Sequence, residues 1–188
     1  MKTNIFIVLM VLMWGVHVTS AQTIYVIDES TISFSSSALL EDIEATTQKA
    51  VAAWNLSTDS IFLKIPMKTF NFVNSIMQEH FNENYSESGK FPYAIFKGKI
   101  FTTGDLTKDG IYNASASGLL TIHGVTRERN MTGKIQVKNG KIQVEAVFNI
   151  KCKDYDIRIP KLLMQNIAEV VTVEVSLSFI PYVKKLNN

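Results

Sequence analysis

Apolar and polar residues alternate with a period of two along much of the chain. The pattern is clearest over Lys141–Lys151, where aliphatic and aromatic residues alternate with Lys, Gln, Glu and Asn, and Val147 is the exception. The same alternation runs over Val171–Phe179 and Ala94–Phe101. Because successive side chains of a β-strand point to opposite faces, each segment predicts a strand with one buried and one solvated face.

Five more segments have the composition of strands, and turn residues separate several of them. They are Thr31–Ser36, Glu41–Leu56, Ser60–Ile65, Ile111–Ile122 and Val125–Lys138. Asn139-Gly140 predicts a type I′ hairpin turn, because both residue types tolerate positive φ angles, and Thr107–Gly110 gives a second turn signal of that kind.

Two short segments have helical spacing. Phe72–Asn82 places its apolar residues on one helix face, and Pro160–Glu169 begins with proline at a first helical position. Long helices do not alternate with the strands, so a parallel α/β sheet is disfavoured. The pattern therefore predicts an all-β fold, an eight-stranded antiparallel up-and-down barrel with one or two short helices.

The first 21 residues have the features of a secretory signal peptide. Lys2 precedes the apolar run Ile5–Val16, and Thr19-Ser20-Ala21 supplies small residues for cleavage after Ala21. The alternative is an uncleaved anchor, but the run is short for a membrane span, which needs about 20 apolar residues. We therefore expect a signal peptide at 1–21, one barrel domain at 22–188, and a periplasmic or secreted location.

Composition narrows the class of protein. The 188 residues are 46% hydrophobic and 19% charged, which indicates a globular chain. The net charge of +2 lacks the strong basic excess typical of nucleic-acid binding, so no nucleic-acid partner is expected. The single cysteine, Cys152, excludes an internal disulfide and a cysteine zinc cluster.

The sequence offers little catalytic chemistry. It contains no G-x-S-x-G, Walker A or G-x-G-x-x-G motif, and after the predicted signal peptide only His80 and His123 are histidines. We therefore predict no catalytic residue and no metal site. One enzymatic hypothesis stays open, in which Cys152 or His123 is reactive, but strand parity opposite Leu120 and Ile122 predicts that His123 points outward.

Two local features bear on the barrel interior. Ala114, Ala116 and Gly118 share one strand face, which indicates either a cavity or small residues lying under a bulky neighbour. Arg127 and Arg129 share the parity of apolar positions, so they could contact a ligand headgroup near the barrel mouth. The alternative, which we favour, is a bulge or register change that turns both arginines outward.

Two ordered motifs resemble a known family. Gly118–Thr126 (GLLTIHGVT) and Phe91–Gly98 (FPYAIFKG) are similar to signatures of the YceI-like family of polyisoprenoid-binding, lipocalin-like proteins. The resemblance covers Ile24–Pro181. It implies an eight-stranded barrel with a hydrophobic pocket, a periplasmic or secreted location, and no catalytic residues. It also implies non-enzymatic binding or carriage of a long-chain amphipathic lipid, such as a polyisoprenoid, quinone-like or fatty-acid derivative, with no other cofactor.

The inward positions of the predicted strands and first helix are the candidates for lining such a pocket. They are Phe34, Leu63, Phe70, Phe72, Met77, Phe81, Phe96, Ile100, Leu120, Ile122, Phe148, Val173 and Leu177. Plain core packing is the alternative for each of them. Accordingly, a filled-barrel structural or stress-response protein without a dedicated ligand is the second functional hypothesis, and transient membrane contact and a homodimer are left open.

Overall fold

The computed structural model describes residues 24–37, 42–159 and 169–183, and most of them lie in antiparallel strands. The strands are β1 (Ile24–Ser37), β2 (Asp42–Thr47), β3 (Val51–Asn55), β4 (Ser60–Pro66), β5 (Asn71–Phe72), β6 (Tyr93–Thr102), β7 (Gly110–Ile122), β8 (Val125–Lys138), β9 (Lys141–Lys151) and β10 (Val170–Pro181). The helical elements are η1 (Met67–Thr69), α1 (Ser75–His80), η2 (Phe81–Tyr85) and η3 (Cys152–Tyr155). None of the helices in these ranges is long and apolar enough to cross a membrane.

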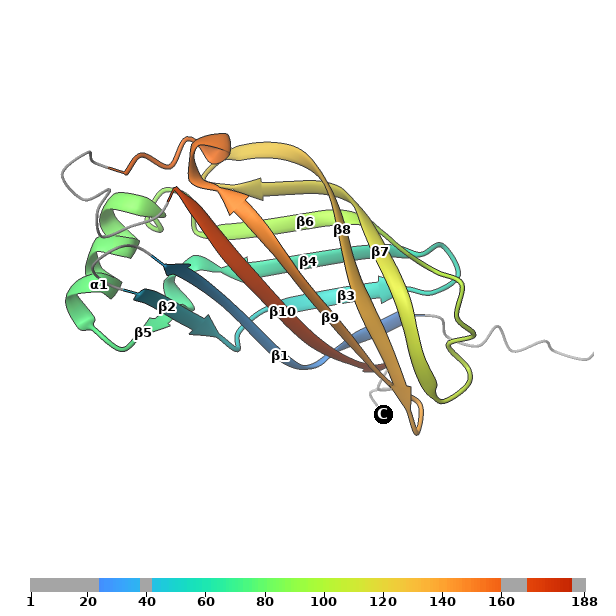
Figure 1. Ribbon diagram of the computed structural model, residues 1–188. Coiled ribbons are helices and arrows are strands. Elements are labelled where there is room, and N and C mark those ends of the chain that lie inside the picture. Colours follow the sequence, from blue (N-terminus) through green and yellow to red (C-terminus); the bar gives the residue numbers. More distant parts are fainter. Residues whose placement is uncertain (1–23, 38–41, 160–168, 184–188) are drawn as a thin grey trace, which may run out of the picture.

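The strands close into a barrel (Figure 1). In the hydrogen-bonded order β10-β9-β8-β7-β6-β4-β3-β1, the last strand β1 also pairs with the first strand β10, which completes a ring of eight. The short strands β2 and β5 extend the sheet beside the second half of β1. Apart from these two strands, the ring follows chain order, so the predicted up-and-down antiparallel barrel is confirmed.

One predicted strand is in fact two. The segment predicted as Glu41–Leu56 is interrupted between β2 and β3, and the prediction of a single strand was wrong. Thr47, which is fully buried, explains the break, because its Oγ1 accepts a hydrogen bond from Lys49 N at 3.2 Å and contacts Thr69 Oγ1 at 2.7 Å. A threonine hydroxyl that bonds to the backbone two residues later offers the chain a turn in place of the ladder.

The helix predicted over Phe72–Asn82 begins later than expected. Phe72 belongs to β5, where it pairs with Ala45, so its assignment to a helix was wrong. Asn74 then caps α1 by accepting a hydrogen bond from Ile76 N at 2.9 Å. The chain continues into the π-helix η2, and we call α1 with η2 the helical cap. The predicted Pro160–Glu169 helix and the signal peptide lie outside the described residues, save Glu169, which is not helical.

The two predicted hairpin turns have different outcomes. Asn139 and Gly140 have φ angles of 52° and 76°, which confirms the type I′ turn between β8 and β9. The turn predicted at Thr107–Gly110 was wrong, because neither Lys108 nor Asp109 adopts a positive φ. The chain instead turns at Asp105–Lys108, where Lys108 N donates to Asp105 O at 3.0 Å.

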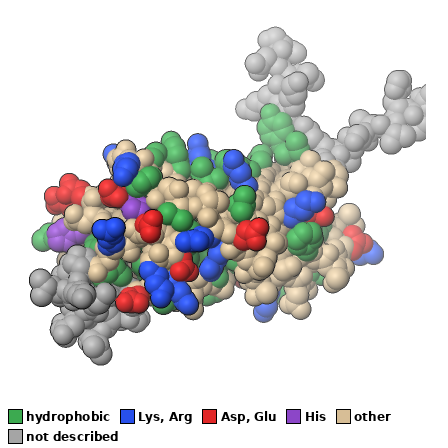
Figure 2. Space-filling view, turned by 90° about the horizontal axis from the view of Figure 1, so that it is seen from above, with side chains coloured by type: hydrophobic (Ala, Val, Ile, Leu, Met, Phe, Trp, Pro, Cys, Tyr) green, Lys and Arg blue, Asp and Glu red, His purple; other side chains and the backbone are tan. Residues whose placement is uncertain are grey.

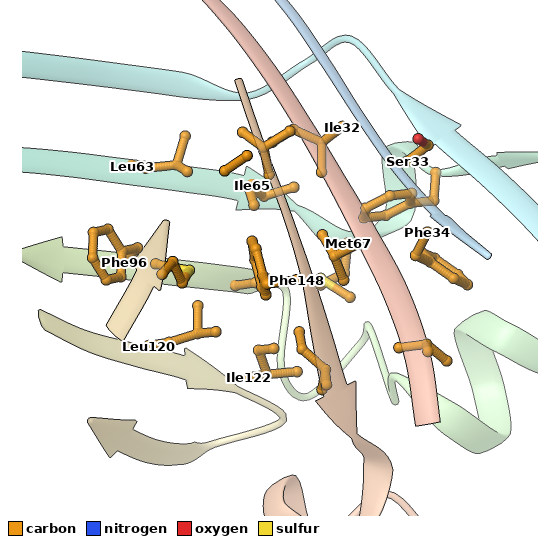
Figure 3. A pocket seen from close by; sticks show the side chains of 18 of the residues that line it. Ile32, Ser33, Phe34, Leu63, Ile65, Met67, Phe96, Leu120, Ile122 and Phe148 are labelled. Atoms are coloured by element: carbon orange, nitrogen blue, oxygen red, sulfur yellow. The ribbon is translucent and has the colours of Figure 1, made fainter. Parts of the chain in front are cut away.

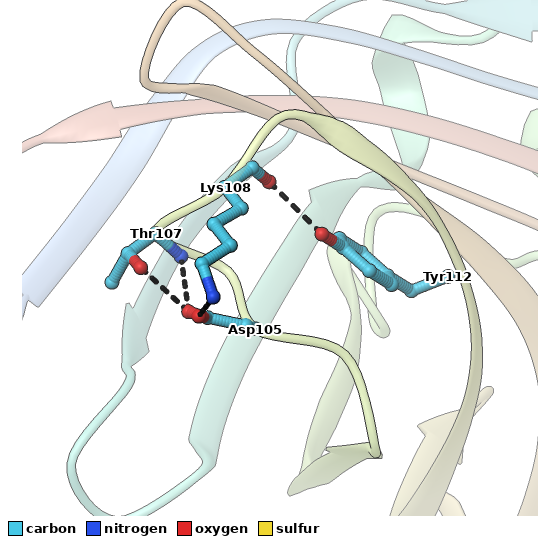
Figure 4. Close-up of polar contacts among 4 residues, drawn as sticks. All are labelled: Asp105, Thr107, Lys108 and Tyr112. Carbon is cyan, nitrogen blue, oxygen red and sulfur yellow. Dashed lines mark hydrogen bonds and ion pairs between the residues drawn. The ribbon is translucent and has the colours of Figure 1, made fainter.

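The side chain of Asp105 organises this loop (Figure 4). One carboxylate oxygen accepts hydrogen bonds from Thr107 Oγ1 at 2.6 Å and Thr107 N at 3.1 Å, and the other lies 3.0 Å from Lys108 Nζ. Tyr112 OH donates to Lys108 O at 3.1 Å and connects the loop to β7. These bonds favour the ionised carboxyl, with the Thr107 hydroxyl contributing most, and lower the pKa of Asp105 to about 2.

We predict that Thr107→Ala raises the pKa of Asp105 toward its ordinary value. The folded pKa is depressed, so the contribution of this carboxylate to stability is present above the unfolded value of 3.8 and is lost as pH falls through about 2. Carboxyl-carbon NMR titration measures the midpoint directly. A wild-type midpoint near 3.8, or one that does not move in the variant, would contradict the assigned hydrogen bonds.

The interior at the end remote from the helical cap is tightly packed. Trp54 and Phe179 are almost fully buried, and their rings meet edge to face with centroids 5.7 Å apart. Ile135 and Ile142, on the strands that lead to the Asn139-Gly140 hairpin, are buried beside them. This packed layer fills the barrel end near the β8–β9 hairpin, whereas the helical cap lies at the other end (Figure 1).

A pair of glycines lets two strands approach closely beside this core. Gly98 of β6 is opposite Gly118 of β7. A Cβ added at Gly98 would lie 2.7 Å from Phe96 Cζ and 2.9 Å from Gly118 Cα. The ring of Phe96 therefore occupies the space above the pair, and this packing has no room for a methyl group.

We predict that Gly98→Ala lowers the free energy of unfolding by roughly 1–3 kcal/mol, because the added Cβ overpacks the site. Urea denaturation followed by tryptophan fluorescence measures the change. Gly89→Ala is the matched control, since nothing lies within 4 Å of a Cβ placed there, and should change stability by less than about 0.5 kcal/mol. Equal stability of the two variants would contradict the close approach.

Candidate functional site

A cavity of about 470 Å³ occupies the interior between the packed layer and the helical cap. Its lining side chains are mostly aliphatic and aromatic, and Figure 3 shows Leu63, Phe96, Leu120 and Phe148 pointing into it from four strands. The volume falls within the range of about 300–1,000 Å³ typical of ligand pockets. The barrel is thus filled at one end and hollow at the other.

Four phenylalanines enclose the cavity where β1, β5 and the helical cap meet. Phe34 lies 5.1 Å from Phe70, 5.8 Å from Phe72 and 5.3 Å from Phe81, measured between ring centroids. Phe81 also lies within 5.8 Å of Phe70 and Phe72. These rings come from segments far apart in sequence, and their mutual contacts attach the helical cap to the barrel.

All thirteen residues proposed as lining from the sequence border this cavity. Whether any of them contacts a ligand stays a prediction. The sequence analysis did not include other residues that line the cavity. Two of them could have been found from strand parity, because Ile150 shares the inward face of Phe148 and Val171 shares the inward face of Val173. Met67 lies in η1, where no strand or helix periodicity marks it.

The small residues of β7 fit both interpretations made from the sequence: two of them line a cavity, and one lies under a bulky neighbour. Ala114 and Ala116 line the cavity, so their missing side-chain volume helps to create it. Gly118 is not among the lining residues and instead faces Gly98 under the ring of Phe96. Its small size serves strand packing.

His123 does not point outward as strand parity predicted. It is a turn residue with a φ of 50°, so strand parity does not apply to it, and its side chain is only 11% exposed and borders the cavity. Its Nε2 lies 2.5 Å from Glu87 Oε2 and its Nδ1 3.2 Å from Tyr155 O. Both ring nitrogens are therefore engaged by oxygen atoms of the protein. Neither nitrogen is then free to act as a base.

Cys152 also borders the cavity but lacks the setting of a nucleophile. It is buried, and this burial raises the pKa of its thiol above the ordinary value. Reactive cysteines need the thiolate, which an electropositive site stabilises and an apolar site disfavours. The enzymatic hypothesis based on Cys152 and His123 therefore gains no support from their surroundings.

Arg127 and Arg129 lie where β8 is no longer paired with β9, and they contact η3 and β9 respectively. The β8–β9 ladder extends only from the hairpin to Gly133 and Ala146, although both strands continue beyond it. Past that point Arg127 Nε donates to Asp154 O at 3.0 Å, and Arg129 donates to Asn149 O. Neither arginine lines the cavity, so the predicted headgroup contact gains no support. The bulge we favoured is also wrong, because the β7–β8 register is continuous through both residues.

Metal binding has no candidate site in the described residues, where no three His, Cys, Asp or Glu side chains cluster. The hollow half of the barrel is an apolar cavity with the His123–Glu87 contact at its rim.

A protein-family model, the YceI-like domain, matches residues 25–179. The chain belongs to the YceI-like family. No curated protein matches it in sequence. Among solved structures, a polyisoprenoid binding domain from Saccharophagus degradans implicated in plant cell wall breakdown has a TM-score of 0.72 at 17% identity, covering 84% of this chain and 98% of its own.

Two further structures share the YceI-like barrel. BcnA of Burkholderia cenocepacia gives a TM-score of 0.68 at 16% identity, with 79% of this chain and 95% of BcnA covered. The Campylobacter jejuni YceI protein gives 0.54 at 15% identity, with 69% and 78% covered. At these identities the likeness establishes the fold alone.

The two YceI-like sequence motifs lie against each other in the barrel. Gly98 of the first motif pairs with Gly118 of the second, and the Phe91 ring lies 4.5 Å from the His123 ring. Gly124, which follows His123 with a φ of 75°, completes a two-residue turn against Phe91. The family signature thus specifies a hairpin and its packing partner at the rim of the cavity.

We predict that Arg129→Met lowers the free energy of unfolding by about 1–2 kcal/mol, because it removes a charged donor from the Asn149 carbonyl. The affinity for a fluorescent prenyl or fatty-acid probe should change by less than about twofold, because Arg129 does not border the cavity. Lys138→Met, on the laddered half of β8 and not bordering the cavity, is the control and should leave both stability and affinity almost unchanged. A tenfold loss of affinity with unchanged stability would instead restore Arg129 as a headgroup contact.

Proposed function

We propose that this YceI-like protein binds and carries a long-chain amphipathic lipid, such as a polyisoprenoid, quinone-like or fatty-acid derivative, without transforming it. The observation that carries the proposal is the 470 Å³ apolar cavity inside a closed barrel. Transfer of apolar surface from water gains roughly 25 cal/mol per Å², so a prenyl or acyl chain gains substantially by entering it. Polyisoprenoid binding by the Saccharophagus degradans domain, which shares the fold, supports the same ligand class.

A carrier of this kind acts where lipid exchanges between membranes and water. The predicted signal peptide supports a periplasmic or secreted protein, and transient membrane contact is part of the proposal. Association into a homodimer is not required by it. The surroundings of His123 and Cys152 support a non-enzymatic role, since neither side chain is prepared for proton transfer or nucleophilic attack.

The alternative of a filled barrel without a dedicated ligand fits only one end of the molecule. The layer around Trp54 and Phe179 is packed in that way, but the half beneath the helical cap is hollow. Ala114 and Ala116 line the hollow half where larger aliphatic residues would fill it. The cavity therefore favours the carrier hypothesis.

We predict that the mature protein purifies with, or takes up, one prenyl or acyl lipid, and that Ala116→Leu weakens this binding about tenfold or more by occupying part of the cavity. Native mass spectrometry detects the added mass, and titration with a fluorescent fatty-acid or prenyl probe gives the affinity. Ser117→Leu is the matched control, because Ser117 is the exposed next residue of β7 and does not line the cavity.

Two results would count against the proposal. A bare protein mass under gentle conditions, with no uptake of either probe, would favour the filled-barrel alternative. Equal loss of affinity in Ala116→Leu and Ser117→Leu would show that the probe binds outside the cavity.

A further inference from the structure

The outer surface of the barrel differs between its two halves. On β8, β9 and β10 the outward residues are mainly Gln, Asn, Thr, Ser and charged residues of both signs. On β3, β4, β6 and β7 the outward positions carry large apolar side chains, and Val51, Phe62, Tyr93 and Leu119 are 51%, 39%, 42% and 47% exposed. Large exposed apolar residues that gather on one face of a water-soluble fold indicate an interaction surface.

These apolar residues are neighbours in space as well as in type. Phe62 lies opposite Lys97 on β6, which in turn lies opposite Leu119 on β7. In the adjacent row Val51 lies opposite Lys64, which lies opposite Ile95. We call the surface formed by Val51, Phe62, Tyr93, Leu119, Lys64 and Lys97 the apolar–basic face.

The charges on the strands of this face have a single sign, and Glu128 of β8, opposite Leu119, lies at its border. Among the described outward positions of β3, β4, β6 and β7 there are three lysines, Lys64, Lys97 and Lys99, and no Asp or Glu. Lys64 Nζ lies 4.4 Å from the Tyr93 ring centroid, and Lys97 Nζ lies 5.8 Å from that of Phe62. Figure 2 shows hydrophobic and basic side chains lying next to one another along the upper edge of the molecule.

We propose that the apolar–basic face docks the protein on an anionic lipid bilayer, from which the cavity exchanges its ligand. Aromatic and aliphatic side chains lie at the headgroup level of a membrane, and lysines beside them reach the phosphates. Each lysine near an anionic surface contributes attraction that salt weakens. The ligand exchange rests on the proposed function, whereas the docking does not.

Charge complementarity selects a bilayer over a second copy of this chain. Two copies joined through this face would bring Lys64, Lys97 and Lys99 against strands β3, β4, β6 and β7 of the other copy, which carry no described carboxylate. Like charges opposed at an interface are unfavourable. Pairing with a strand of another protein is also disfavoured, because β3, β4, β6 and β7 each have hydrogen-bonded neighbours on both sides.

The position of the face suits lipid exchange. Tyr93 lies opposite Pro66, the last residue of β4, and Met67 N donates to Pro92 O at 2.9 Å where η1 begins. The chain then passes through η1 and β5 into the helical cap, and Val73 just before the cap and Ile76 within it are also exposed. Docking through this face brings the hollow end of the barrel, with its helical cap, to the membrane.

The test is co-sedimentation of the full mature protein with vesicles of phosphatidylcholine, or of phosphatidylcholine and phosphatidylglycerol in equal parts. We expect binding to the anionic vesicles that added salt weakens, and little binding to the neutral ones. Lys64→Gln/Lys97→Gln/Lys99→Gln should weaken binding on the order of a hundredfold, at about fivefold for each lysine. Phe62→Ser/Leu119→Ser should weaken it too, with unchanged ionic-strength dependence.

The matched control is Lys134→Gln/Lys138→Gln/Lys151→Gln, which removes the same charge from the outer surface of β8 and β9. It should bind almost as the wild type does. Equal weakening by both lysine variants, or equal binding to neutral and anionic vesicles, would overturn the proposal. The proposal would also be overturned if the protein failed to bind vesicles and instead formed a concentration-dependent dimer that Lys64→Gln/Lys97→Gln/Lys99→Gln abolishes.

Probe uptake from free solution separates this inference from the proposed function. The lysine variant of the apolar–basic face should bind a fatty-acid probe in solution as the wild type does and acquire it more slowly from anionic vesicles. Vesicle binding without probe uptake would leave the docking surface standing and remove the carrier function. Probe uptake without vesicle binding would leave the carrier function standing and remove the docking surface.

Discussion

The hydrogen bonds between β1 and β10 are the constraint on which the rest of the molecule depends. They join the first and last of the described strands from Tyr25–Pro181 to Ser35–Thr172, with one register shift between Ile27 and Glu29. Closure joins the two ends of the sheet and gives every strand a defined inside, and β8 and β9 are unpaired with each other only beyond Gly133 and Ala146. Once the ring is closed, a shift of register by one residue would exchange the inward and outward side chains of a strand. The alternation in the sequence thereby fixes both the apolar interior and the composition of the outer surface.

Side-chain volume then decides how the interior is used. An eight-stranded barrel is just wide enough for its own side chains to fill it or for one small ligand to fit inside. Trp54 and Phe179 fill one end, whereas Ala114, Ala116 and Ala146 line the other. The phenylalanine cluster around Phe81 holds the helical cap over the hollow end. The same strands therefore form both the packed layer and the cavity, because large and small residues occupy successive inward positions.

The sequence pattern predicted the regular strands correctly, and its predictions failed at turns and irregular contacts, where the alternation ends. Period-two alternation located the strands and, together with the helical spacing of Met77 and Phe81, placed thirteen proposed residues around one cavity, because side-chain direction follows from the backbone period. His123 was misplaced since it belongs to a turn, where parity has no meaning. The break after Thr47 depends on a hydroxyl contact with Thr69, 22 residues away in sequence. Arg127 and Arg129 keep the predicted parity but contact carbonyls across a gap in the ladder, which no local pattern reveals.

The outer surface requires a separate explanation from the interior. A barrel strand needs apolar side chains only on its inward face, and β10 meets that requirement with Thr172, Glu174 and Ser176 turned outward. The fold therefore does not demand Phe62 or Leu119 at exposed positions, where their rings and methyl groups meet water. The presence of residues that neither fill the core nor improve solvation is explained most simply by a binding partner that covers them. The lysines among them, with no described carboxylate on β3, β4, β6 or β7, indicate that the partner covering this face is anionic. The face lies beside the helical cap, and this position connects it to the cavity.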